Sequence, residues 1–302
     1  MDTLGELRRR LGTTDDIAGI VRTMKALAAV SIRQYEAAVH SLADYSRTIE
    51  LGLHAALRDL PAVEEAVARR DRLRAVGAVV FGSDHGLCGR FNEDIVAHAL
   101  ARLGERPPGT GLHLLAIGAR VAALLEHSGQ TAERQLLGPG SAARIGATVR
   151  EVLLEIDAWQ QRAGVQRVYL FHNRPGAGER YRPATVRLLP VSPARLRNLA
   201  TRRWPGPSLP AFTMERKILV AALLRQYFFV SVFRASAESL AAENATRLAA
   251  MQAAERNLAE RHAELLAGLR RSRQEAITTE LLDVVAGYEA LQGPSRRAPI
   301  RS

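Results

Sequence analysis

Proline is absent from two long stretches of this 302-residue sequence. None lies between Met1 and Leu60, and none lies between Ala211 and Gly293. Because proline removes a backbone donor and clashes with the preceding helical turn, stretches without it can form continuous helices. The distribution therefore predicts two long helical arms, residues 1–60 and 211–291, on either side of a middle region that can turn.

Both arms carry apolar residues at steps of three and four. In the first arm they are Leu4, Leu7, Leu11, Val21, Met24, Ala28, Ile32, Tyr35, Val39, Leu42, Tyr45 and Ile49. In the second they are Leu223, Tyr227, Val230, Ala237, Leu248, Met251, Leu258, His262, Leu265, Leu269, Leu281, Val285 and Tyr288. Such a stripe is the seam of a coiled coil. As helices, the arms would span roughly 85 Å and roughly 120 Å, so we expect them to pair as an antiparallel coiled coil.

The middle of the chain alternates between two patterns. Short apolar runs typical of buried strands occur at Val76–Phe81, Leu112–Ile117, Gln166–His172, Ala184–Val191 and, more weakly, Thr131–Leu137. Helical patterns lie between them at Asn92–Leu103, Ala119–His127 and Ser141–Arg162. The alternation predicts a central Rossmann-like α/β domain over residues 75–200, with a largely parallel sheet. We expect the proline-rich segment Trp204–Pro210 to be a hinge and the basic tail, residues 292–302, to be disordered.

The formal net charge of +11 indicates an acidic partner, which nucleic acid, an anionic membrane surface or an acidic protein face could supply. Aromatic residues make up only 5% of the chain, which disfavours base stacking and favours an acidic protein. No apolar run is long enough to span a membrane, since Arg225 and Gln226 interrupt the most apolar stretch, Ile218–Phe233. No secretory signal is recognisable at the N-terminus.

The glycine-rich loop Ser83–Asn92 is the most suggestive chemical motif. Its spacing matches neither of the glycine motifs that bind nucleotides, so we interpret it as a structural turn. Asp84, His85 and Cys88 could be imagined as a nucleophilic site, but nothing in the sequence indicates the low thiol pKa that this requires. A single cysteine excludes an internal disulfide, and the histidines lack metal-ligand spacing. We expect no catalytic residue, no cofactor and no metal.

Three segments, in chain order, resemble the gamma subunit (central stalk) of F-type ATP synthases. The first, Leu7–Leu11 leading to Met24–Ala29, resembles the basic opening helix of that family. The second, GSDHGLCGRFN at Gly82–Asn92, is similar to the family signature SDRGLCGGLN. The third begins with ENATRL at Glu243 and ends with RQEAITTEL at Arg273–Leu281, which resembles the family ending RQASITQEL. The third segment is the most specific.

The resemblance implies a rotor subunit that is not itself an enzyme. Its terminal helices would form a shaft inside a ring of alternating catalytic and non-catalytic (alpha and beta) subunits. The middle domain would bind the epsilon subunit near the membrane rotor ring, and rotation would couple ion flow to ATP synthesis or hydrolysis. The contacts with the catalytic ring that the resemblance implies are Arg8, Arg9, Met24, Lys25, Arg247, Arg273, Gln274, Thr278 and Glu280.

Several positions depart from the family pattern. Asp15–Ile20 replaces a usual NTQKIT, Lys25 stands where the family often has an acid, and Arg90 replaces a glycine. These departures indicate a divergent branch, an alternative F-type ATPase. Because the first motif begins within ten residues of Met1, we expect a bacterial protein, peripheral on the cytoplasmic side of the inner membrane.

Two other functions remain open at this point. One is a phosphate- or nucleotide-using α/β enzyme with coiled-coil arms, which bound ligand in the purified protein would favour. The other is a basic nucleic-acid-binding coiled-coil protein, which steeply salt-dependent binding to DNA or RNA would favour.

Overall fold

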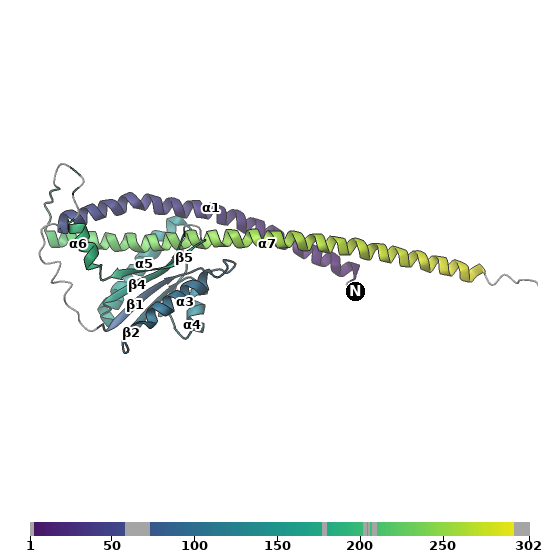
Figure 1. Cartoon of the computed structure of the whole chain (residues 1–302), viewed down its shortest axis with the longest axis horizontal. Helices are drawn as coiled ribbons and strands as arrows, with labels where there is room; N and C mark the ends of the chain where they lie inside the picture. The colour runs from purple at the N-terminus through teal and green to yellow at the C-terminus, as the bar shows by residue number, and fades with distance from the viewer. Residues whose placement is uncertain are drawn as a thin grey trace, which may run out of the picture. The chain divides into compact units, whose positions relative to one another are not determined.

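The computed structural model describes residues 3–57, 73–176, 180–201, 204, 206 and 210–292. It has the expected fold class: an α/β domain with a five-stranded sheet, and one long helix from each end of the chain (Figure 1). The chain divides into a terminal unit, residues 1–24 with 251–302, and a central unit, residues 25–250. The elements in order are α1 (Leu4–Leu57), β1 (Ala75–Phe81), α3 (Phe91–Gly104), β2 (Gly111–Ile117), α4 (Ala119–His127), β3 (Arg134–Leu136), η2 (Ala142–Arg144), α5 (Ile145–Ala163), β4 (Arg167–Arg174), β5 (Arg182–Leu189), α6 (Pro193–Thr201) and α7 (Arg216–Gln292).

The sheet has the order β3-β2-β1-β4-β5. The first four strands in this order pair in parallel and β5 pairs antiparallel with β4, so the sheet is largely parallel as predicted. Every residue of the central strand β1 is buried, because both faces of the sheet are covered. Val79 and Phe81 pack in a core with α5 and α7, whereas Val76 and Val80 pack with α3 and α4 (Figure 1).

The strand predictions are confirmed to within a few residues, and α4 has the predicted bounds. The predicted last strand, Ala184–Val191, is shifted: β5 covers Arg182–Leu189 and ends before Pro190, which has no N–H to donate to a neighbouring strand. The predicted helix Ser141–Arg162 starts as the short 3₁₀ turn η2, and the α-helix α5 begins only at Ile145. The sequence analysis missed α6 altogether.

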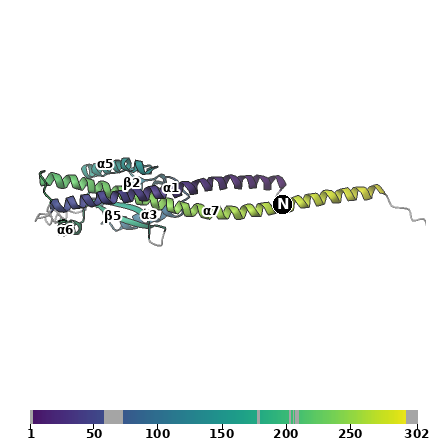
Figure 2. The same ribbon diagram turned by 90° about the horizontal axis from the view of Figure 1, so that it is seen from above.

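Helices α1 and α7 lie side by side in the central unit and run antiparallel (Figure 2). Tyr45 on α1 donates a hydrogen bond to Gln226 on α7 at 2.9 Å, and further along α1 the backbone of Gly52 lies against the side chain of Leu223. In the terminal unit the same two helices pair through Asp15 and His262, whose side chains are 3.3 Å apart. As residue numbers rise along α1, those of its partners fall along α7.

The seam of each helix repeats every seven residues. On α1 the buried members are Leu7, Thr14, Val21, Ala28, Tyr35, Ile49 and Ala56. On α7 they are Val230, Ala237, Asn244, Met251 and Leu265. A seven-residue repeat keeps the seam facing the partner helix, as in a left-handed coiled coil. The two polar members bond to their own helices, Thr14 to the carbonyl of Arg10 and Asn244 to that of Leu240, each at 2.8 Å.

The predicted hinge is described only at residues 204, 206 and 210. There the ring of Trp204 stacks on that of His54 near the end of α1, with ring centroids 5.3 Å apart. A hydrogen bond also joins His54 Nδ1 to the carbonyl of Leu199 on α6. Of the basic tail expected to be disordered, residues 293–302 lie outside the described residues.

Candidate functional site

The glycine-rich loop after β1 is held in one shape by its own polar groups. The Oδ1 atom of Asn92 accepts the backbone N–H of Ser83 at 2.9 Å, and its Nδ2 donates to Ser83 Oγ at 2.8 Å. Ser83 Oγ donates to the carbonyl of His85 at 2.7 Å. Leu87 and Gly89 adopt positive φ angles of 64° and 59°. The loop is a fixed turn, in agreement with the structural interpretation of its sequence.

Asp84 uses both carboxylate oxygens within the domain. Its Oδ1 accepts the N–H of Ala119 at the start of α4 at 3.1 Å, and its Oδ2 accepts the N–H of Gly138 at 3.0 Å. A carboxylate at a helix N-terminus is stabilised by the unpaired N–H groups there. Asp84 therefore joins three segments at one edge of the sheet.

Cys88 lies in a closed position. It is buried in a cluster with Phe91 and Ala242, and its Sγ is 3.6 Å from Ser83 Oγ. Burial raises the pKa of the Cys88 thiol, and its hydrogen bond with Ser83 opposes this only in part. Because a nucleophilic cysteine needs a lowered pKa and access to substrate, the geometry is that of a packing residue.

Two charged residues of α7 meet this loop. Arg247 Nη1 lies 2.7 Å from Glu243 Oε1, one helical turn away, and the two side chains are only 12% and 9% exposed. The other guanidinium nitrogen, Nη2, donates to the carbonyls of His85 and Gly86 at 3.4 and 3.5 Å. We refer to the loop Gly82–Asn92 and the helical turn Glu243–Arg247 together as the loop–helix junction.

Glu243 is the electrostatically unusual member of the junction. Burial raises the pKa of its carboxyl group, the charge and hydrogen bond of Arg247 lower it, and the nearby charge of Asp84 raises it. A buried carboxylate is tolerated when it is paired and hydrogen-bonded. Arg247 therefore forms an ion pair with the Glu243 carboxylate and at the same time donates hydrogen bonds to the loop carbonyls.

The loop–helix junction lies at the edge of the sheet where a fold of this type binds nucleotides. In sheets of order 3-2-1-4-5 the ligand site lies outside the carboxyl ends of the strands, where the strand order reverses. Here that point is between β1 and β4. The junction follows β1, and His172 near the end of β4 bonds to Glu238 of α7 at 2.9 Å. The chain's own helix thus lies against this edge, which weighs against a nucleotide-using enzyme.

The residues that the sequence predicted to contact partners lie at several places along α1 and α7. Arg8 and Arg9 are exposed near the start of α1, and Met24 and Lys25 are half-buried further along it. Only Arg247 lies in the junction. Arg273, Gln274, Thr278 and Glu280 are exposed on the last turns of α7.

Sequence reasoning missed the importance of Glu243, Glu238 and His172. Glu243 lies in the third family-like motif, four residues before Arg247, and this spacing alone predicts a helical ion pair. The contact between Glu238 and His172 has no such local signal, because 66 positions separate the two residues.

The end of α7 carries an uncovered apolar stripe. Its members follow the coiled-coil spacing and are between 56% and 67% exposed: Ile277, Leu281, Val284 and Tyr288. Every residue from Arg273 to Tyr288 is exposed. A regular apolar stripe of this kind marks a surface that another protein covers.

One helix in the described part of the chain, α7, contains a stretch that is long and apolar enough to cross a membrane. The test uses length and composition only, and core helices of soluble proteins also pass it. The sequence analysis found no such stretch because it required an uninterrupted apolar run. In the central unit Val230 of this helix packs against α1 and Val232 packs against the sheet, but only 17% of the apolar stretch is buried.

Among the described residues, no three His, Cys, Asp or Glu side chains are grouped so that they could hold a metal ion.

Residues 3–291 match a family model described as ATP synthase. Among solved structures, the chain is similar to a chain of the mitochondrial ATP synthase of Euglena gracilis, OSCP/F1/c-ring in rotational state 3. The identity is 18%, the TM-score is 0.67, and 99% of each chain is covered. It is also similar to a chain of the rotor of the same organism's enzyme, with 18% identity, a TM-score of 0.61, and coverage of 91% of this chain and 98% of that one.

A third similar structure is the central stalk/c-ring of the mitochondrial ATP synthase of Tetrahymena thermophila. Here the identity is 22%, the TM-score is 0.56, and the match covers 78% of this chain and 99% of that chain. At these identities the structural likenesses show a shared fold.

Proposed function

The chain belongs to the F-type ATP synthase gamma family, and we propose that it is the rotating central stalk of such an enzyme, without a catalytic centre of its own. The observation that carries the proposal is the uncovered end of α7. A regular apolar stripe on residues 273–288 needs a surrounding partner, and the family provides one in its ring of alpha and beta subunits.

The proposed mechanism is mechanical. A shaft that contacts ring conformers differently in each orientation shifts their populations, and this shift couples rotation to nucleotide affinity. Torque can pass along the chain only if α7 and the α/β domain turn together. The loop–helix junction, through Arg247, and the shared core, through Val232 and Ala237, hold α7 to the domain within the central unit.

The partners follow from the same proposal. We propose that the alpha and beta subunits surround the ends of the long helices and that the α/β domain meets the epsilon subunit and the membrane rotor ring. The exposed ring contacts would be Arg8, Arg9, Arg273, Gln274, Thr278 and Glu280, with Met24 and Lys25 further along α1. For Arg247, which is nearly buried, we propose that its contribution comes through the loop that it holds.

As a stalk subunit of a membrane-associated enzyme, the chain would be a peripheral protein. We propose the cytoplasmic face of a bacterial inner membrane as its location. An alkaline wash of native membranes should release it, whereas an inserted protein would stay with the lipid.

Co-purification from native membranes tests the function. The tagged chain should bring down a ring with ATPase activity and support ATP-driven ion pumping. A chain that ends at Ser272 should keep its fold, yet recover at least about tenfold less ring and lose pumping, because the apolar stripe is gone. A chain that ends at Gln292 is the matched control.

Recovery of the chain alone, or with nucleotide or nucleic acid, would contradict the proposal. Equal recovery of the ring by the chains that end at Ser272 and at Gln292 would contradict the role given to the end of α7.

A further inference from the structure

A cavity of about 240 Å³ lies in the central unit where α1, β4, β5, α6 and α7 meet. Three arginines from three different elements line it: Arg174 from β4, Arg195 from α6 and Arg234 from α7. All three arginines are exposed, so water screens part of the repulsion between their guanidinium groups, and a bound anion would offset the rest.

Only one of the three arginines is neutralised within the described residues. Arg195 Nη2 lies 2.8 Å from Glu50 Oε1, and its guanidinium also lies over the ring of Tyr227. No carboxylate among the described residues is within ion-pair distance of Arg174 or Arg234. Arg174 is in addition directly opposite Arg182 in the register of β4 and β5, an unfavourable pair of like charges.

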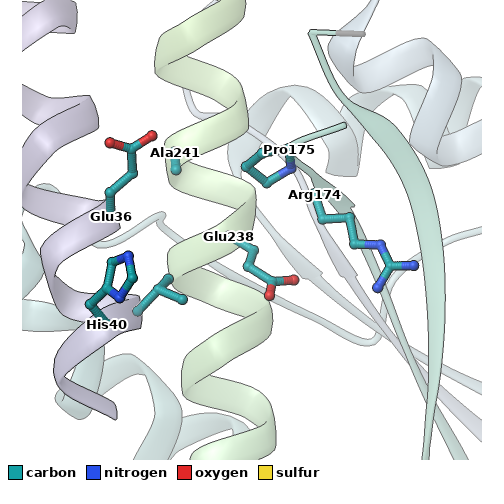
Figure 3. Close-up of a pocket in the computed structure, with 7 residues that line it drawn as sticks. Glu36, His40, Arg174, Pro175, Glu238 and Ala241 are labelled. Atoms are coloured by element: carbon teal, nitrogen blue, oxygen red, sulfur yellow. The ribbon is translucent and has the colours of Figure 1, made fainter. Parts of the chain in front are cut away.

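Among the described residues that line the cavity, the one carboxylate, Glu238, is hydrogen-bonded to a histidine. Glu238 Oε2 is 2.9 Å from Nε2 of His172, a side chain that is only 2% exposed. The other ring nitrogen of His172, Nδ1, is buried without a hydrogen-bond partner among the described residues. Figure 3 shows Glu238 on α7 beside Arg174, in a neighbouring open hollow whose far side is formed by Glu36 and His40 of α1.

We propose that this cavity is a binding site for a phosphate-type oxyanion, held by the guanidinium groups of Arg174 and Arg234. A guanidinium presents its donors in a planar fork that matches phosphate oxygens. The volume is that of about eight water molecules, which accommodates a phosphate group with a few waters but no nucleotide.

A bound oxyanion would join α7 to the sheet, because Arg234 and Arg174 belong to these two elements. It would add a further connection between α7 and the domain, separate from the loop–helix junction and from the shared core. Since the anion binds only the folded chain, it would stabilise the central unit by mass action. The inference stands independently of the rotor function.

Titration of the full chain with inorganic phosphate, at ionic strength fixed with chloride, tests the site. We expect saturable binding by calorimetry and a parallel rise in the melting temperature. The double variant Arg174→Gln/Arg234→Gln should bind phosphate at least about tenfold more weakly. Arg187→Gln, which removes an exposed arginine of β5 that does not line the cavity, should bind like the native chain.

Stability without phosphate separates loss of the site from misfolding. The double variant should then be at least as stable as the native chain, because it relieves repulsion between arginines. If phosphate binding is not saturable, or is equal in the double variant and the native chain, the inference is wrong unless a lipid supplies the phosphate group.

Flotation with vesicles that contain phosphatidic acid decides the source of the phosphate group. Flotation that depends on Arg174 and Arg234, without binding of inorganic phosphate, would identify a lipid headgroup. If neither phosphate binding nor vesicle flotation depends on Arg174 and Arg234, the proposed site is wrong.

Discussion

The inner half of α7, Arg216–Ala250, and its outer half, from Met251 onward, belong to one continuous helix with opposite surroundings. Between Ala235 and Asn244 nearly every residue of the inner half is buried, including Ser236, Ser239 and Glu243. In the outer half the seam is still buried at Leu265, but every residue from Arg273 to Tyr288 is exposed.

The difference shows that periodicity and burial are separate properties of this helix. The inner half packs α1 on one side and the α/β domain on another, so even polar positions are covered. The outer half keeps the apolar spacing but pairs with α1 only up to the first residues of that helix. Exposing its remaining apolar face to water is unfavourable in free energy, and a protein partner that buried this face would remove that cost.

The largest effect should come from charge placed on the uncovered stripe. Leu281→Asp with Val284→Asp should weaken association with the catalytic ring roughly a thousandfold, because two apolar side chains could no longer be buried. The free energy of unfolding of the isolated chain should stay within about 0.5 kcal/mol of native. Ring recovery and urea denaturation measure the two effects.

The control for this pair is Thr279→Asp with Ala286→Asp, which adds the same two charges on the opposite face of the helix. Equal loss of association in the control would mean that total charge, and not the stripe, decides binding.

The next effect concerns two ion pairs of similar chemistry in the two halves. Arg247→Leu should destabilise the chain by about 3 kcal/mol, because Glu243 would be left buried without a partner. Arg261→Leu breaks the exposed pair with Glu264 in the outer half and should cost less than about 0.5 kcal/mol. Chemical denaturation measures both, and similar costs would show that the junction does not differ from the solvated helix.

The Arg247 variant should also respond to pH. Burial already raises the pKa of Glu243, and loss of Arg247 removes the group that lowers it, so the pKa should rise further. A raised folded-state pKa gives stability that is complete below the ordinary glutamate pKa and is lost as pH rises through the folded value. Arg247→Leu should therefore be more damaging at pH 8 than at pH 5. Adding Glu243→Gln should abolish that difference.

A smaller effect is expected from overpacking the seam. Ala237→Leu in the inner half should destabilise the chain by about 2 kcal/mol, because its side chain is fully buried between α1 and the domain. Ala276→Leu makes the same change on the exposed outer half and should be neutral within about 0.5 kcal/mol. Thermal unfolding of the two variants compares them directly, and equal costs would contradict the assigned burial.

The smallest effect should come from the pair Asp15 and His262, which joins α1 and α7 in the terminal unit. Both side chains are substantially exposed, so His262→Ala should change the free energy of unfolding by at most about 0.5 kcal/mol. Denaturation at low and high salt measures it. A larger loss would mean that the terminal unit depends on this pair more than on its seam.

Much of the candidate site was accessible from sequence. The loop after β1, its structural character and the basic position Arg247 were all identified there. What sequence could not supply was the partner of each group, since Arg247 and His85 are 162 positions apart. The seam positions of Thr14 and Asn244 were missed because the sequence analysis looked for apolar residues at the seam. Both polar side chains are tolerated there because each donates a hydrogen bond to a carbonyl of its own helix.

The sequence by itself determined the two long helices, the alternating α/β middle and the family. Proline placement and apolar spacing are local properties, and they survive in any context that permits a helix or a strand. Only the tertiary structure decided that α7 would lie against the edge of the sheet, bury Glu243 and gather three arginines around one cavity. These features depend on contacts between residues far apart in the chain, which the local pattern does not encode.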